Sequence, residues 1–441
     1  MQEVLYSSSF DLYYSTYSVN KILIITPHYP PSNLAAVHRT RLFAQHLPAL
    51  GWQPIILTVD EKYYEEALDW NLHQLLPAGQ RIEKVKAFRV TKPRLIGDIG
   101  LRGFFQLRSK ALQIVKEEKI DFVYIPIPSF YVSLIGAYLH RKTGVKYGID
   151  YIDPWVHQFP GSDKLFSRHW FSTKLAKWLE PKAISRASLI TGVAEGYYKA
   201  VIERNPALLS TCTFGAMPYG GEEEDHKKLS QLNIQPYLFQ KKNKTQLVYA
   251  GAMLPKAFKP LEAVFLAISE NQSLFSNVEF HFIGTGKSTA DPNGYNIKPM
   301  AEKYGLWQTV VFEYPQRIPY PDVLVHLDIA DGIFILGSTE PHYTPSKAYQ
   351  GVLSGKPVLA ILHTESTAVK VLEESGAGMV LSFNGEAETN KIYTNWLTTW
   401  NKFCSYAKNF NPGSVNSKLF EQYSAKAVTA KLAQLLDGLF I

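Results

Sequence analysis

Short apolar runs alternate with segments of helical spacing through the first half of the chain. Residues 35–50 carry apolar side chains at helical intervals, and Gly51 ends this predicted helix because glycine readily adopts the left-handed conformation of a helix terminus. The pattern begins as strand, loop, helix and strand, which is typical of a doubly wound parallel sheet. The predicted strands are residues 21–25, 54–59, 89–90, 122–125, 146–151 and 189–192.

The same rhythm starts again after residue 245. A helix is expected at residues 261–269, and strands are expected at residues 246–249, 278–283, 309–312, 332–336, 358–362 and 379–381. Residues 221–244 separate the two series; they are polar and charged and lack a long apolar run. Two such sheets that face each other form a cleft at the carboxyl ends of their strands, where ligands usually bind.

We therefore predict an α/β protein with two doubly wound, Rossmann-like domains. The expected units are an N-terminal extension (1–19), a first domain (20–220), a connection (221–244), a second domain (245–420) and a C-terminal helix (421–441) placed to pack back towards the first domain. The length of 441 residues agrees with two domains, because a single hydrophobic core rarely serves so long a chain.

One apolar stretch offers an alternative to this arrangement. Residues 122–139 carry no charge over a length that could just span a bilayer. Pro126 and Pro128 interrupt the stretch and split it into a short strand and the start of an apolar helix. We prefer the second interpretation, a buried strand and helix of a parallel sheet.

The composition indicates in which cellular compartment the protein is expected. Apolar residues make up 46% of the chain and charged residues 19%, as in globular proteins. Cys212 and Cys404 are far apart and predict neither a disulfide framework nor a metal site. Residues 1–19 lack the basic and apolar regions of a signal peptide, so we expect a cytoplasmic protein.

Basic residues gather in the first half of the chain. Residues 1–220 contain 26 basic and 18 acidic side chains, a net charge of +8, whereas residues 221–441 contain 20 and 21, a net charge of −1. In residues 94–119 and 164–182 the basic residues are interleaved with Phe, Trp and Leu, which is typical of segments that lie on an anionic membrane. A surface helix with snorkelling lysines explains the pattern equally well. No recognised nucleic-acid module is present, so we expect no nucleic-acid partner; a peripheral position on the cytoplasmic face of a membrane stays open.

Residues 344–360 predict a helix start suited to an anion. Thr344 is a good N-cap, and Pro345 suits the first helical position, where its missing N–H costs nothing. Ser346 and Lys347 add a hydroxyl and a cation to the free N–H groups, which favours a diphosphate. The alternative is an ordinary helix-to-strand unit of an α/β protein.

Six segments, in their order along the chain, resemble the GT-B-fold glycosyltransferases of family 4. They are Ile22 to Ile25 followed by His28-Tyr29-Pro30-Pro31, Ile149-Asp150-Tyr151-Ile152-Asp153-Pro154-Trp155, Met217-Pro218-Tyr219-Gly220-Gly221-Glu222, Val248-Tyr249-Ala250-Gly251, Phe282-Ile283-Gly284-Thr285-Gly286, and the stretch from Pro345-Ser346-Lys347 to Pro357. The likeness runs from about residue 21 to residue 436.

The resemblance implies two Rossmann-like domains that face each other across a cleft, the GT-B fold. It also implies transfer of a sugar, with retention of configuration, from a nucleoside-diphosphate sugar to a hydroxyl acceptor. For this family, the acceptors include lipid-linked saccharides that are extended during polysaccharide or glycolipid assembly. The donor would bind the second domain.

The chain departs from this family at two carboxylates. The family usually carries two glutamates, with seven residues between them, before Gly-x-Pro, and here His342 and Gln350 occupy those places. Gln350 keeps a carbonyl oxygen that can accept from a ribose hydroxyl, but it has no charge. Glu340, two residues before the first place, is a candidate substitute.

The donor site also needs cations, because the leaving diphosphate develops negative charge as the glycosidic bond breaks. The Arg and Lys that usually follow the glycine of the first donor loop are Ala252 and Ala257 here. No divalent metal is required for this role, and the chain has no Asp-x-Asp pair to hold one, so we expect no cofactor beyond the donor substrate. The predicted donor-binding residues are Gly251, Lys256, Lys259, Gly284, Gly286, Glu340, His342, Thr344, Ser346, Lys347 and Gln350.

The acceptor-side candidates come from the first domain. Asp153 follows a strand and can orient the incoming hydroxyl, and His28 is the second catalytic candidate. The plain alternatives are a turn aspartate before proline and a structural loop histidine. The other predicted acceptor-side residues are Ser32, Asn33, Asp150 and Trp155, where Trp155 either stacks on a sugar or belongs to the core.

Two other functions stay open. The missing carboxylates and cations suit a non-catalytic member of the fold that acts as a partner or scaffold at the membrane. A sugar-nucleotide epimerase with the same two-domain fold fits less well, because the ordered segments follow the transferases.

Overall fold

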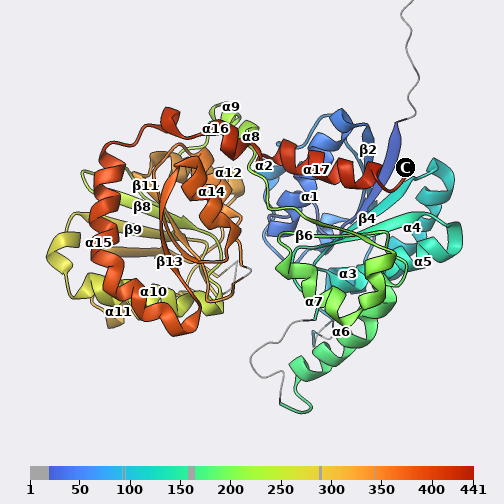
Figure 1. The fold of residues 1–441 in the computed structure, drawn as a ribbon, viewed down its shortest axis with the longest axis horizontal. Helices are drawn as coiled ribbons and strands as arrows, with labels where there is room; N and C mark the ends of the chain where they lie inside the picture. The colour runs from blue at the N-terminus through green and yellow to red at the C-terminus, as the bar shows by residue number, and fades with distance from the viewer. Residues whose placement is uncertain (1–18, 92, 95, 157–163, 288–290, 342) are drawn as a thin grey trace, which may run out of the picture.

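The chain forms two α/β lobes that lie side by side (Figure 1). The structure is a computed structural model that describes residues 19–441, apart from residues 92, 95, 157–163, 288–290 and 342. All but the last residue of the predicted N-terminal extension therefore lies outside the described residues. Each lobe is built on a parallel sheet with helices on both faces, which confirms the predicted fold class.

The N-terminal lobe holds seven parallel strands in the order β3-β2-β1-β4-β5-β6-β7. The strands are β1 (Asn20–Ile25), β2 (Trp52–Val59), β3 (Arg81–Val85), β4 (Phe122–Ile127), β5 (Lys146–Tyr151), β6 (Leu189–Gly192) and β7 (Thr213–Ala216). The helices are α1 (Ala35–His46), α2 (Trp70–His73), α3 (Ile99–Arg102), α4 (Phe104–Glu118), α5 (Ser133–Thr143), α6 (Arg168–Ile184) and α7 (Gly196–Arg204). The chain reverses its direction of growth between β1 and β4, and such a switch point opens a crevice at the carboxyl ends of the strands.

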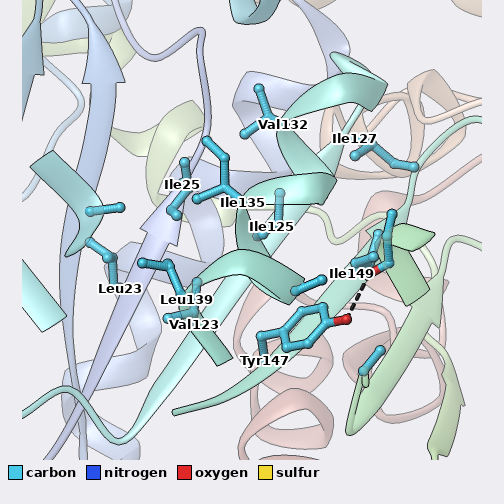
Figure 2. Packing of buried hydrophobic residues seen from close by; sticks show 14 of the residues in the cluster. Leu23, Ile25, Val123, Ile125, Ile127, Val132, Ile135, Leu139, Tyr147 and Ile149 are labelled. Carbon is cyan, nitrogen blue, oxygen red and sulfur yellow. Dashed lines mark hydrogen bonds between the residues drawn. The ribbon is translucent and has the colours of Figure 1, made fainter. Parts of the chain in front are cut away.

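Both faces of this sheet are apolar, as the near-continuous apolar runs predict. Figure 2 shows one face, where Ile25 of β1 and Val123 of β4 pack with Ile135 and Leu139 of α5. The hydroxyl of Tyr147 on β5 donates to the carbonyl of Ala183 in α6 at 2.6 Å, so a polar atom that enters this core is satisfied.

The C-terminal lobe repeats the plan with six parallel strands in the order β10-β9-β8-β11-β12-β13. The strands are β8 (Thr245–Ala250), β9 (Val278–Ile283), β10 (Val311–Tyr314), β11 (Gly332–Leu336), β12 (Val358–His363) and β13 (Gly378–Phe383). The helices are α10 (Phe258–Ser269), α11 (Lys298–Lys303), α12 (Tyr320–Ile329), α13 (Lys347–Leu353), α14 (Thr367–Ser375), α15 (Thr389–Lys408) and α16 (Ser417–Glu421). Here the switch point lies between β8 and β11.

Most predicted strands are confirmed, and one is wrong. Residues 89–90 are not a strand; the edge strand is β3, residues 81–85. Its charged and apolar residues alternate in an exposed position, so it has no apolar run to reveal it. The sequence reading also missed β7, and residues 122–139 form β4 and the start of α5, as the two prolines predicted.

Two segments join the lobes. The connection contains α8 (Glu223–Lys227) and α9 (Leu229–Leu232), and the chain ends in α17 (Ala425–Asp437), which returns to the N-terminal lobe (Figure 1). There α17 packs on α1, and the indole N–H of Trp52 donates to Asp437 at 2.8 Å. Among the described helices, none combines the length and apolar character that a membrane span requires.

Candidate functional site

A cavity of about 190 Å³ lies between the two lobes. The N-terminal lobe contributes Asn33 from the loop after β1 and part of α1. The C-terminal lobe contributes Gly251 and Gly284, which directly follow β8 and β9, and the start of α13. The cavity therefore sits at the carboxyl ends of strands from both sheets, where the fold predicts a ligand.

Gly251 and Gly284 line this cavity in conformations that favour glycine, with φ angles of 127° and 71°. Their N–H groups donate to the carbonyls of Ile283 and Tyr314, each at 2.8 Å, so these glycines offer close approach rather than free donors. Gly286 does not line the cavity. A Cβ atom there would lie 2.6 Å from the carbonyl of Pro315, so this glycine serves packing within the loop.

Lys347 brings an unpaired cation to the cavity. Its Nζ is buried, has no hydrogen-bond partner in the described part of the chain, and lies 3.7 Å from the ring centroid of Tyr249. Burial, and then the charge of Arg317, lower the pKa of Lys347 to about 7. A buried lysine whose pKa is shifted this far, in a cavity between two lobes, is a candidate for a functional group that binds an anion.

Arg317 is the second cation of the cavity and comes from the loop after β10. Its Nη1 donates to the carbonyl of Asn33 across the lobe boundary at 3.0 Å, which fixes the guanidinium at the cleft. Burial lowers the pKa of Arg317, although the charge of Glu66 opposes this effect. Arg317 forms no salt bridge within the described part of the chain, so Arg317 and Lys347 together give this wall excess positive charge.

The two arginines of α1 that line the cavity are already neutralised. Arg39 donates to Asp150 from Nε at 2.6 Å and from Nη2 at 3.1 Å, and Arg41 pairs with Asp225. Their neighbour His38 contacts Asn33 through Nε2 at 2.8 Å, and burial lowers its pKa to about 3, so it is neutral. This side of the cavity provides rigid walls rather than excess charge.

The predicted cap at Thr344 is wrong. Helix α13 begins at Lys347, three residues later, and its N-cap position is Ser346, which makes no side-chain cap hydrogen bond. The hydroxyl of Thr344 instead pairs with the hydroxyl of Thr367 at 2.8 Å. Ser346 and Lys347 nevertheless line the cavity. Because α13 has only seven residues, we expect the side chain of Lys347 to contribute more to anion binding than the terminus of this short helix does.

Gln350 also lines the cavity, and its carbonyl oxygen already accepts one hydrogen bond. It accepts from Nε2 of His226 in the connection at 2.8 Å, with the tautomer assigned from this contact. Burial lowers the pKa of His226, which keeps the ring neutral. One lone pair of the Gln350 carbonyl oxygen is therefore used by His226; the second lone pair and the amide N–H₂ can serve a ligand, and the acceptor role of Gln350 stays a prediction.

Three other predicted donor residues lie outside the cavity. Lys256 pairs with Glu340 at 3.0 Å, and Lys259 pairs with Glu386. Both lysines are exposed, so the structure does not bring them or Glu340 to the donor pocket. Their spacing from Gly251 in the sequence suggested the role, but the turn after residue 254 carries them to the surface. His342 lies outside the described residues.

Asp153 lies at the cleft beside tyrosines from both lobes. Burial raises the pKa of Tyr197 and Tyr219 of the N-terminal lobe and of Tyr343 of the C-terminal lobe, and the charge of Asp153 adds to each increase. Asp153 itself is exposed to solvent, and partial desolvation by the surrounding side chains raises the pKa of Asp153 to about 6. The group is thus placed to hold or accept a proton near neutral pH.

His28 belongs to a polar cluster beside the cavity. Its Nδ1 lies 2.7 Å from Oε1 of Glu66, which also accepts from the hydroxyl of Ser32 at 2.6 Å. Burial alone would raise the pKa of Glu66, but the contacts with His28 and Ser32 outweigh it and lower this pKa to about 2. Glu66 therefore orients His28, and Ser32 is buried in support of the cluster.

Asp150 and Trp155 have structural roles. Asp150 is fully buried and binds Arg39 and the hydroxyl of Thr191, so it positions Arg39 instead of facing an acceptor. Trp155 is buried and stacks on Phe130 at 5.9 Å between ring centroids, so it is not available to a sugar. The predicted acceptor contacts of Asp150 and Trp155 are therefore wrong.

Sequence reasoning missed Arg317, Arg39, Arg41 and His38. A signal for the α1 residues was present, because His38, Arg39 and Arg41 interrupt an otherwise apolar helix directly after the first strand. Arg317 stands alone in a loop, and nothing in its surroundings marks it. Among the described residues, no group of three or more His, Cys, Asp or Glu side chains could hold a metal ion.

Comparisons with known proteins bear on the fold. No protein-family model matches the chain, and no curated protein matches it. Sucrose-phosphate synthase from Thermosynechococcus elongatus aligns with a TM-score of 0.63 and 13% identity, over 96% of this chain and 99% of that chain.

Two further solved structures are similar. HepE from Anabaena, in complex with UDP, aligns with a TM-score of 0.61 and 14% identity over 95% of this chain and 100% of its own. The trehalose-6-phosphate synthase OtsA gives a TM-score of 0.65 and 11% identity over 95% and 99%. These structures confirm the GT-B fold expected from the resemblance; membership of family 4 stays a prediction.

Proposed function

We propose that the protein is a glycosyltransferase that transfers a sugar from a nucleoside-diphosphate sugar to a hydroxyl acceptor. The observation that carries this proposal is the placement of Lys347 and Arg317, two cations that form no salt bridge with any described residue, in an interlobe cavity at the carboxyl ends of both sheets. HepE, which shares the fold, has been solved in complexes with UDP and with UDP-glucose. Its nucleotide supports a uridine diphosphate as the first donor to test.

In this proposal the diphosphate binds between Lys347 and Arg317. Negative charge on the leaving diphosphate grows in the transition state, and fixed cations in a pocket with little water stabilise that charge more strongly than water does. Gly251 and Gly284 let the backbone approach the phosphates, and the Ser346 hydroxyl can donate to them. The cations that the family places after the first donor loop are thus supplied here by α13 and the loop after β10.

Asp153 and the His28–Glu66 pair would act on the acceptor side. Asp153, with a pKa of about 6, is ionised at neutral pH and can accept a hydrogen bond from the incoming hydroxyl. His28 pairs with Glu66 through Nδ1, which leaves Nε2 as the nitrogen that would contact an acceptor. We propose retention of configuration with these groups as orienting residues, in line with the family 4 resemblance.

The proposed setting is polysaccharide or glycolipid assembly at the cytoplasmic face of a membrane. The basic first half of the chain and its exposed aromatic residues support such a place, with a lipid-linked saccharide as the acceptor class.

Thermal unfolding in the presence of UDP-, GDP- and ADP-sugars tests the proposal. A donor at one hundred times its Kd stabilises the folded state by about 2.7 kcal/mol. Lys347→Met should remove this stabilisation, whereas Lys256→Met, a matched change at an exposed lysine, should retain it. Absence of stabilisation by all these donors at millimolar concentration would contradict the proposal.

A non-catalytic scaffold is the second candidate, because Gln350 and His342 replace the usual glutamates. Donor hydrolysis distinguishes the two functions, because many transferases release free sugar slowly when no acceptor is present. A protein that binds the donor, but yields neither free sugar nor product with any hydroxyl acceptor offered, would be the scaffold.

A further inference from the structure

Helix α6 exposes a stripe of large apolar side chains. Phe171, Leu175 and Trp178 follow one another at helical spacing and are 54%, 41% and 61% exposed. The opposite face of α6, with Ala176 and Ala183, is buried against the rest of the N-terminal lobe. The helix therefore carries apolar side chains on both sides. Packing against the lobe accounts for the buried side, but it does not account for the exposed stripe.

A basic groove lies beside this stripe. It has a volume of about 450 Å³ and lies among α4, α5 and α6, on the part of the N-terminal lobe that Figure 1 shows away from the C-terminal lobe. Arg108, Arg141 and Lys182 contribute its charges. None of the three forms a salt bridge with any carboxylate in the described part of the chain. The groove carries uncompensated positive charge on a surface that also carries exposed aromatic rings.

Aromatic faces hold two of these cations in place. The guanidinium of Arg108 lies 5.3 Å from the ring centroid of Phe105 and 4.9 Å from that of Tyr138. The ammonium of Lys182 lies 3.1 Å from the ring centroid of Trp178, the last member of the stripe. Because a π-face does not neutralise a cation, these groups remain able to bind an anion. Phe105 is itself 59% exposed, so apolar surface borders the groove on two sides.

We propose that this surface docks the protein on an anionic bilayer, with a lipid phosphate headgroup in the groove between α4, α5 and α6 and the Phe171–Leu175–Trp178 stripe in the interfacial region. A bilayer satisfies both halves of the surface at once, because anionic headgroups and apolar chain segments lie next to each other there. A soluble phosphate would fill the groove and leave the stripe in water. Lys174 and Lys177, exposed beside the stripe, add charge of the sign that an anionic leaflet attracts.

This docking surface is separate from the interlobe cavity and does not depend on the proposed glycosyl transfer. No residue of the groove lines the cavity. Loss of membrane binding and loss of donor binding can therefore be measured independently on the same variants.

Co-sedimentation of the full chain with vesicles tests the proposal. We expect binding to phosphatidylcholine vesicles that contain phosphatidylglycerol and little binding to phosphatidylcholine alone, with binding weakened as salt rises. The variant Arg108→Glu/Arg141→Glu should weaken binding by at least about tenfold, since each cation near the surface contributes roughly 1 kcal/mol. The control Lys402→Glu/Lys408→Glu makes the same change in net charge on exposed lysines of α15 and should bind as the unaltered protein does.

Trp178 provides a second readout that a purely electrostatic contact would not move. Its fluorescence should shift to shorter wavelength on anionic vesicles, and the shift should be lost in Trp178→Phe. Equal losses in the groove and control variants, or equal binding to both vesicle types, would overturn the proposal. So would displacement of the vesicles by inorganic phosphate at constant ionic strength, which would identify free phosphate as the ligand. Thermal stabilisation by UDP-sugars serves as the independent check that each variant is folded and keeps its cavity.

Discussion

Lys347 keeps a charge-bearing group where charge is costly. Its ammonium is buried close to Arg317 and has no hydrogen-bond partner among the described residues, so the charged form costs free energy in the folded protein, which loss of the proton or a bound anion relieves. Residues that bind ligands often carry such a penalty, and their replacement then stabilises the protein while it removes function.

The variant Lys347→Met separates these two effects. The pKa of Lys347 is lowered to about 7, so its charged form opposes folding at neutral pH and below. We expect Lys347→Met to raise the free energy of unfolding by about 1–2 kcal/mol and to weaken UDP binding by about 10–100-fold. Denaturant unfolding and calorimetric titration measure the two quantities. A variant that is both less stable and fully able to bind would show that Lys347 is an ordinary core side chain.

The pH dependence of donor binding follows from the same group. Because Lys347 loses its proton near pH 7 in the free protein and an anion favours the charged form, binding takes up a proton above that pH. The affinity for UDP should therefore fall as pH rises from 7 to 9, by up to about tenfold per unit. Lys347→Arg stays charged throughout this range and corrects for titration of UDP itself. A constant ratio of the two affinities across this range would contradict the assignment.

Asp153 gives the acceptor side a separate pH signature. Desolvation raises its pKa to about 6, so below that pH the carboxyl is protonated and accepts a hydrogen bond from an acceptor hydroxyl only weakly. We expect kcat/KM for transfer to rise as pH increases through 6, and we expect Asp153→Asn to lower kcat by about 100-fold and remove this rise. If Asp153→Asn retains the full pH profile, Asp153 is only a turn residue before Pro154.

At the scale of elements, Glu313 of β10 joins the donor loop to a helix. One carboxylate oxygen accepts from the hydroxyl of Thr285 at 2.8 Å and from the N–H of Asn296 at 2.9 Å, and the other accepts from the N–H groups of Ile297 and Lys298 at 2.9 and 2.8 Å. The start of α11 and the loop that contains Gly284 therefore share one buried anion.

Replacement of this carboxylate should loosen both elements. We expect Glu313→Ala to lower the free energy of unfolding by about 2–4 kcal/mol, because four donors lose their acceptor in a buried place. UDP binding should weaken several-fold through the loop. Glu302→Ala, at an exposed site on α11, should change stability by less than about 0.5 kcal/mol. Similar effects of the two changes in denaturant unfolding would show that Glu313 is not the organising contact.

The elements also show what sequence patterns can and cannot predict. Apolar strands such as β1 and β4 are buried on both faces, so their position follows from hydrophobicity alone. The edge strand β3 carries alternating charges, and its existence depends on the neighbouring β2 instead. In the same way, Thr344 has the residue type of a cap, but Thr367 of another helix takes its hydroxyl.

The site residues also divide into those that a local sequence pattern marks and those that a distant contact places. Gly251 and Lys347 could be predicted because short local patterns mark them. Arg317 and the Arg39–Asp150 pair could not be, because each acquires its place from a contact with a segment more than one hundred residues away. The predicted place of Lys256 in the donor pocket was wrong for a related reason. A local turn and the ion pair with Glu340 hold its flexible side chain at the surface.

For the whole molecule, a buried ion pair is one of the contacts at the junction between the lobes. Arg41 of α1 and Asp225 of α8 are almost completely buried, and the hydroxyl of Tyr320 on α12 donates to Asp225 at 3.1 Å. The backbone N–H of Tyr320 also donates to Asp69 of the N-terminal lobe at 2.6 Å. The N-terminal lobe, the connection and the C-terminal lobe therefore all contribute to this polar cluster.

Removal of one partner should be far more damaging than removal of both. Arg41→Met leaves Asp225 buried without its cation, which should lower the free energy of unfolding by about 3–5 kcal/mol. The double variant Arg41→Met/Asp225→Leu removes the orphaned charge and should recover most of that loss.

Scanning calorimetry adds the test at the scale of the molecule. If the cluster couples the lobes, Arg41→Met should divide a single unfolding transition into two, because each lobe has its own sheet and hydrophobic cores, and the double variant should restore one transition. Additive losses in the double variant would mean that Arg41 and Asp225 act through separate neighbours. The cavity lies between these lobes, so UDP should raise the temperature of both transitions in Arg41→Met if the donor bridges them, and of the C-terminal transition alone if it does not.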